Sequence, residues 1–245
     1  MSVFTISEMV SKVGRRVGLR ITSAPIGSSD DQIAQFVELF NEEVSETGTR
    51  FRWSALTHEA TFQTVAVEDQ GMFVGSGGIL AVADEYNYII SDTMWDRTGR
   101  FPVAGPTSTL NWQAKKALNY TTGPFPEYRI RANRLLFSPI PAASHDIFFE
   151  YASKKFVYNP DEDTYGQVFS TNDSVPVLDC DLIMQGVRWR WKMAKGFQYA
   201  EEKRTHELDV ANASSRDAGR KRLSLAGGNS IGGGQRVGDL RTTQL

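Results

Sequence analysis

Apolar residues are spaced in two different ways along this sequence, and the order of the two spacings limits the folds that the chain can adopt. Near both ends apolar residues recur every three or four positions, as in residues 5–17 and 178–197, which is typical of amphipathic helices. From about residue 51 to residue 169 the period falls to two, as in residues 59–67, and Gly and Pro separate short runs. The order predicts an α+β fold: a bundle of N- and C-terminal helices with an inserted antiparallel β domain and an extended C-terminal tail.

The boundaries follow from helix capping signals and composition. Thr5 and Glu8 form a capping box for the first helix, which Gly18 should end. A second helix should begin at residues 28–30 and end at Gly48. We therefore expect N-terminal bundle helices in residues 1–50, a β-rich domain in 51–170, C-terminal bundle helices in 171–225, and a glycine-rich tail in 226–245.

Inside the β-rich region, the sequence predicts two specific elements, a hairpin and a short helix. Ala132-Asn133 separates two short apolar runs and predicts a tight hairpin. Leu110, Ala114 and Leu118 share one face of a short helix that Ser108 or Thr109 should cap.

Composition excludes several classes of protein. The chain has 245 residues and a net charge of −2, without the basic excess of a dedicated nucleic-acid binder. Its apolar runs are too short to cross a membrane. Cys180 is the single cysteine and the three histidines are scattered, so the sequence predicts no disulfide, no metal site and no cofactor. We expect a protein made in a reducing cytoplasm.

The sequence contains no constellation typical of catalysis. Asp179 and Asp181 could in principle serve as a glycosidase pair, but they stand where acids cap the start of a helix. Trp189 and Trp191 alternate with basic residues, yet on a helix they project about 200° apart and cannot form one stacking platform. We expect one ring in the bundle core and the other at its margin or at a domain or subunit interface. The chain is therefore predicted not to be an enzyme.

The second helix has an unusual charge, with six acids and no base between residues 28 and 46. Such a face is commonly just solvated. The alternative hypothesis is that Asp30, Glu38, Glu42 and Glu46 face either a DNA channel, where they would repel phosphates, or a basic neighbouring subunit.

Several runs between residues 28 and 216 resemble one known family. The chain is similar to the head-to-tail adaptor proteins (connector, or tail tubular protein A) of tailed, mainly short-tailed, bacteriophages. The similar runs are residues 51–62, 91–98, 105–106, 111–113, 128–131, 135–139, 149–151, 189–192, 194–196 and 199–201.

The resemblance implies a structural role in the virion. Such adaptors combine a helical bundle with a β domain and form a ring, usually of twelve copies, in the neck between capsid and tail. The implied partners are the portal protein and a tail nozzle or tail tube protein. DNA passes through the ring without specific binding.

The tail must be interpreted separately, because it lies outside the similar core. Residues 216–245 carry six bases and two acids, and six of the twelve residues 227–238 are Gly. In related adaptors such an extension docks on the portal, and we expect the same here; the alternative is a tail packed on its own bundle. The expected portal contacts are Arg220, Lys221, Arg222, Ile231, Arg236, Val237, Leu240, Arg241 and Leu245.

Two other functions stay open at this point. A tail-associated cell-wall hydrolase would need two carboxylates facing a cleft. A nucleic-acid-binding protein would use the basic C-terminal segment.

Overall fold

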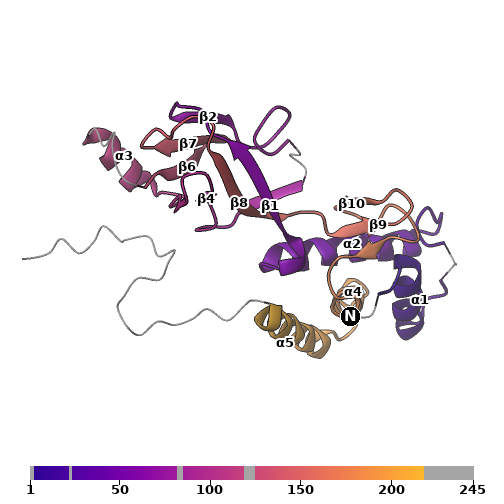
Figure 1. Ribbon diagram of the computed structural model, residues 1–245. Helices are drawn as coiled ribbons and strands as arrows, with labels where there is room; N and C mark the ends of the chain where they lie inside the picture. The colour runs from indigo at the N-terminus through magenta and orange to yellow at the C-terminus, as the bar shows by residue number, and fades with distance from the viewer. Residues whose placement is uncertain (1–2, 22–23, 82–84, 119–124, 218–245) are drawn as a thin grey trace, which may run out of the picture. The chain divides into compact units, whose positions relative to one another are not determined.

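The structure is a computed structural model that describes residues 3–21, 24–81, 85–118 and 125–217. It confirms a mixed α+β fold with N-terminal helices and antiparallel strands (Figure 1). The described residues divide into two compact units: a helical unit of residues 3–21, 24–58, 85–88 and 151–217, and a β-rich unit of residues 59–81, 89–118 and 125–150. The chain passes from one unit to the other within three strands, β1, β3 and β8.

Four α-helices make up most of the helical unit. Helix α4 packs against each of the other three (Figure 1). Their core contains Val10, Phe36, Ile183 and Trp191, all buried. The helices are α1 (Ile6–Val17), α2 (Asp31–Arg50), α4 (Cys180–Ala194) and α5 (Ala200–Asp217).

The capping signals place the helix ends correctly, with one exception. Thr5 and Glu8 form the expected capping box, and Gly18 ends α1 in the left-handed conformation, at φ 78°. Gly48, however, lies inside α2, which continues to Arg50. A Cβ atom at position 48 would lie 2.5 Å from the ring of Phe156, so this glycine admits an aromatic ring instead of ending the helix. The indole N–H of Trp53 donates to the carbonyl of Thr47, near the true end of α2.

A small antiparallel sheet also belongs to the helical unit. Its strands have the order β10-β9-β11, and Val157 of β9 is part of the helical core. The expected β-rich domain of residues 51–170 was therefore too wide, because residues 151–170 pack with the helices. The strands are β9 (Val157–Asn159), β10 (Thr164–Gly166) and β11 (Val175–Pro176).

The β-rich unit contains most of two further sheets. One has the order β1-β8-β4-β5, with β3 also pairing with β8; the other has the order β2-β7-β6. Phe62 on β1 contacts Phe137 on β7 and Phe149 on β8, so aromatic rings join the two sheets. The strands are β1 (Thr57–Gln63), β2 (Asp69–Met72), β3 (Tyr86–Ile89), β4 (Trp95–Asp96), β5 (Phe101–Pro102), β6 (Glu127–Arg131), β7 (Arg134–Ser138) and β8 (Asp146–Ser153).

The predicted hairpin is confirmed, and one predicted strand is shorter than expected. Ala132 and Asn133 connect β6 to β7 with φ values of 47° and 58°, the two positive values that a type I′ turn needs. Strand β1 stops at Gln63 instead of running to residue 67. The side-chain amide of Gln70 accepts a hydrogen bond from the backbone N–H of Val65 and donates one to its carbonyl oxygen. These two bonds hold a loop at Val65 in place of further strand.

The two tryptophans of α4 diverge, but both are buried. Trp191 packs edge-on against Phe36 in the core. Trp189 faces Tyr199 and Lys203, where α5 begins, and no described group accepts a hydrogen bond from its Nε1. The prediction that the two rings point in different directions was correct. Trp189 is nevertheless buried as well, because the start of α5 covers it.

Candidate functional site

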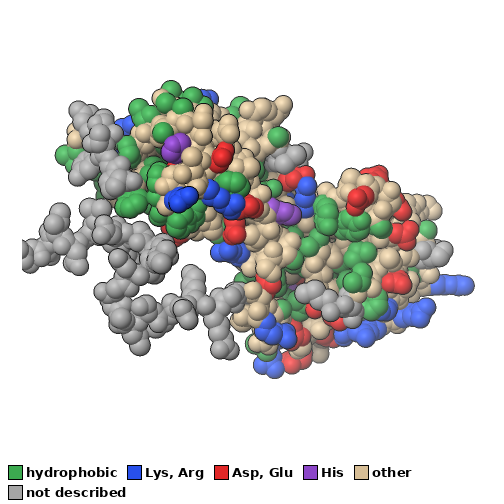
Figure 2. Space-filling model, in the orientation of Figure 1, with side chains coloured by type: hydrophobic (Ala, Val, Ile, Leu, Met, Phe, Trp, Pro, Cys, Tyr) green, Lys and Arg blue, Asp and Glu red, His purple; other side chains and the backbone are tan. Residues whose placement is uncertain are grey.

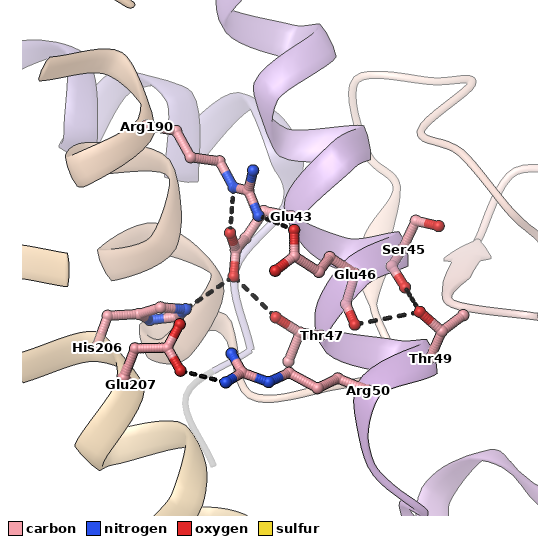
Figure 3. A network of polar contacts seen from close by, with 9 residues as sticks. All are labelled: Glu43, Ser45, Glu46, Thr47, Thr49, Arg50, Arg190, His206 and Glu207. Atoms are coloured by element: carbon pink, nitrogen blue, oxygen red, sulfur yellow. Dashed lines mark hydrogen bonds and ion pairs between the residues drawn. The ribbon is translucent and has the colours of Figure 1, made fainter. Parts of the chain in front are cut away.

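A buried carboxylate joins three helices of the bundle. Glu43 on α2 is 1% exposed and accepts hydrogen bonds from Arg190 Nε of α4 at 2.6 Å and Thr47 Oγ1 at 2.8 Å. His206 Nε2 of α5 lies 3.0 Å from Glu43 Oε1 (Figure 3). All these donors converge on one carboxyl group, so α2, α4 and α5 share a polar centre within the core of the bundle.

The surroundings of Glu43 favour its charged form. Burial raises the pKa of this carboxyl, but the hydrogen bonds from His206 and Arg190 and their electrostatic attraction outweigh burial, and the pKa lies below its usual value. Arg190 also bonds Glu46, one turn further along α2 (Figure 3). Since its two oxygens are held by three donors, Glu43 is arranged to connect helices rather than to move a proton.

Further polar contacts fasten α5 to the region around the end of α2. Arg50 forms an ion pair with Glu207, and this hydrogen bond lowers the pKa of the Glu207 carboxyl (Figure 3). Asp217, the last residue of α5, accepts from the backbone N–H and the hydroxyl of Ser54, both at 2.6 Å. The bundle is thus closed by polar groups as well as by its apolar core.

The four acids singled out on the second helix have different surroundings. Asp30 caps α2 by accepting from the N–H of Gln32 at 2.8 Å, and Glu46 accepts from Arg190. Glu38 and Glu42 are exposed. Glu43 was not singled out from the sequence. The available signal was that Glu43 stands next to Val44, a residue of the apolar stripe of this helix. The hypothesis that these acids face a channel or a basic neighbour stays a prediction.

The acids at the start of α4 have the expected structural role. Asp179 caps α4 by accepting from the N–H of Asp181 at 2.9 Å. The nine residues expected to contact the portal, from Arg220 to Leu245, lie outside the described residues.

Helix α3 (Thr109–Ala117) presents an apolar stripe to solvent. Ser108 caps it as expected, and Trp112 faces inward, at 2% exposed. Leu110 and Leu118 are 78% and 69% exposed. With Ala114, also exposed, these two leucines form what we call the α3 stripe.

A histidine and a buried acid lie together in the β-rich unit. His145 Nδ1 is 2.6 Å from Asp96 Oδ2, and Asp96 also accepts from the N–H of Gly99 at 2.6 Å. The backbone N–H of His145 donates to Thr64 Oγ1. These contacts tie the loop before β8 to β4 and to the end of β1, which is a positioning role.

Two shallow grooves lie among the described residues of the two units. In the β-rich unit a groove of about 340 Å³ is lined by Trp95, Arg97 and three carboxylates, those of Glu59, Asp92 and Glu150. Arg97 lies over the ring of Phe148 and forms an ion pair with Glu59. In the helical unit a groove of about 400 Å³ is lined by side chains of α1, α4 and α5, with two Arg and two Glu among them: Arg16, Gln185, Arg188, Glu201, Glu202 and Thr205.

Within the described residues, no three His, Cys, Asp or Glu side chains are grouped as metal ligands. No helix in the described ranges combines the length and the apolar character that crossing a bilayer requires.

Comparison with known proteins adds no assignment. No family model matches the chain, and no curated protein matches it in sequence.

Proposed function

We propose that the chain is a subunit of an adaptor ring in the neck of a tailed bacteriophage, joining the portal to the tail. In this role it would take part in assembly, and DNA would pass the ring without specific binding. The family resemblance of residues 28–216 supports the proposal, and the helical bundle with a β-rich unit agrees with the fold that the resemblance implies.

The α3 stripe is the observation that carries the proposal. Burying a leucine side chain is favourable by about 1.5–3 kcal/mol, so Leu110 on α3 and Leu118 directly after it, both exposed, favour association. Exposed apolar surface of this kind is typical of protein–protein contacts. Because Trp112 anchors the opposite side of α3, the stripe is held outward in a fixed position.

The test is attachment to portal-bearing capsids. Wild-type protein should bind these capsids and appear as a ring in negative-stain images of the neck. The double variant Leu110→Ser/Leu118→Ser should fold with an unchanged melting temperature but fail to complete the neck with the tail protein. Leu208→Ser, which changes a leucine 55% exposed on α5, is the matched control. Normal neck assembly by the double variant, or no capsid binding by the wild type, would contradict the proposal.

The tail gives a second test of the same function. Deleting residues 226–245 should leave the melting temperature unchanged and abolish attachment to portal-bearing capsids. Attachment at the wild-type level would show that the tail is not the portal contact.

A cell-wall hydrolase is the second candidate, because the groove of the β-rich unit brings carboxylates and an aromatic ring together. Asp92 and Glu150 line this groove and would be the acid pair, and Trp95 would be the ring on which a sugar stacks. A zymogram on peptidoglycan tests this directly: a cleared band lost in both Asp92→Asn and Glu150→Gln would favour the hydrolase.

A nucleic-acid-binding role is the third candidate and rests on the basic residues of 216–245. A salt-dependent gel shift with duplex DNA separates it from the adaptor, for which we expect weak or no binding.

A further inference from the structure

Helix α2 carries an outer face of acids with no basic partner. Asp31, Glu38 and Glu42 are spaced seven and four residues apart, so they lie on one side of the helix. All three are exposed, and none forms an ion pair with a described residue. We call these three residues the acidic face. Like charges four residues apart on a helix destabilise it by about 0.2–0.5 kcal/mol, so the face favours a positive partner.

Helix α1 carries the opposite charge. Lys12, Arg15 and Arg16 are exposed on the helix, and Arg20 is exposed just beyond it. We call these four residues the basic face; Figure 2 shows Lys and Arg side chains gathered over α1. Lys12 lies over the ring of Phe4, and Arg15 and Arg20 form no ion pair with any residue the structure describes.

The two faces belong to the same unit but do not neutralise each other. Helices α1 and α2 both pack on α4, and no ion pair joins their described charges. One molecule therefore presents two surfaces of opposite sign. A second copy of the chain offers the complement of each.

We propose that the acidic face of one copy docks on the basic face of the next. The inference rests on the proposed ring function and names the contact between neighbouring subunits. Because the two faces are different surfaces, the contact is head-to-tail, and such a contact generates a ring when the rotation between copies closes. Complementary charge of this kind sets orientation and excludes wrong pairings.

Charge reversal tests the contact, with rescue as the readout. The acid-reversed variant is Glu38→Lys/Glu42→Lys, and the base-reversed variant is Arg15→Glu/Arg20→Glu. Either variant alone should remove the opposite charge of one face, place like charges at the changed positions and weaken self-association at least tenfold. An equimolar mixture should restore association, because each variant then meets the complement of both its faces. A single chain carrying all four changes should also associate.

The matched control is Asp161→Lys/Glu162→Lys, which reverses two exposed acids in the β9–β10 turn and should associate like the wild type. Association is measured by sedimentation at 50 and 500 mM NaCl, since added salt screens exposed charges and should weaken the contact. Each variant is also tested for ring formation on portal-bearing capsids, and circular dichroism checks that it folds.

The outcomes separate this inference from the proposed function. If both variants form rings on capsids like the wild type, the docking is wrong and the adaptor function stands. If the wild type associates in solution with the expected rescue but does not bind capsids, the docking stands and the adaptor function is wrong. The docking is overturned if the variants lose association and neither the mixture nor the four-change chain restores it. It is also overturned if the wild type associates neither in sedimentation nor on capsids. Duplex DNA binding that Arg15→Glu/Arg20→Glu abolishes, with self-association unchanged, would assign the basic face to nucleic acid instead.

Discussion

Gly186 on α4 faces the carboxyl group of Glu43 on α2 so closely that a Cβ atom at position 186 would lie 2.0 Å from Glu43 Cδ. The buried acid occupies the space that a side chain at 186 would fill. The two residues are therefore one packing arrangement, although 143 positions separate them in the sequence.

Gly186→Ala should destabilise the protein. Alanine normally favours a helix interior over glycine by about 0.5–1 kcal/mol, but here its methyl group would displace Glu43 and cost about 1–3 kcal/mol. Urea unfolding followed by circular dichroism measures the difference. A variant as stable as the wild type, or more stable, would contradict this packing.

Glu43→Gln should cost about 3 kcal/mol at pH 7, because it removes the buried carboxylate that pairs with Arg190 and leaves this guanidinium only the exposed Glu46 as counter-ion. The folded-state pKa of Glu43 is below the unfolded value of 4.5, so its stabilisation is present above pH 4.5 and is lost as the pH falls through the folded-state pKa. The stability difference between wild type and variant should therefore shrink below pH 4.5. Glu42→Gln, at an exposed position on the same helix, is the control and should change stability by less than about 0.5 kcal/mol. A difference that stays constant down to pH 3 would show that the charge of Glu43 is not the cause.

Trp191→Ala and Trp189→Ala should each cost about 3–5 kcal/mol, because both rings are buried. Trp189→Phe should cost less than Trp191→Phe, since it removes a buried N–H that no described group accepts, whereas the Trp191 ring packs against Phe36 in the core. Thermal unfolding of the four variants tests the order. Wild-type melting temperatures for both alanine variants would mean that α4 is not a core helix.

Ala132→Gly should stabilise the protein by about 1 kcal/mol. Ala132 has φ 47°, in the left-handed region that costs an L-residue about 1–2 kcal/mol and costs glycine little. Ala211→Gly, at an exposed position within α5, is the matched control and should destabilise by about 1 kcal/mol. Equal effects of the two substitutions in urea unfolding would argue against the type I′ turn.

Local signals in the sequence predict local structure well here. The capping box at Thr5 and the Ala132-Asn133 turn involve residues a few positions apart, so their physics is contained in short segments. Gly48 shows the limit: its glycine is explained by the ring of Phe156, which only the folded chain brings to α2.

The polar centre of the bundle could not be predicted from the sequence either, because its residues meet only in the folded chain. Glu43 counted as one of six acids on a charged helix, and nothing near it in the sequence points to Arg190 or His206. The α3 stripe is intermediate: its shared face was predicted from spacing, but its exposure depends on Trp112 taking the inner side.

The ion pair between Arg50 and Glu207 has a consequence for the order in which the chain can fold during synthesis. Its partners are 157 positions apart, so α1 and α2 leave the ribosome long before the helices on which they pack. All segments of the β-rich unit, up to residue 150, are complete before α4 begins. We therefore expect the β-rich unit to fold while the chain is still being made, and the apolar sides of α1 and α2 to be available to chaperones until α5 emerges.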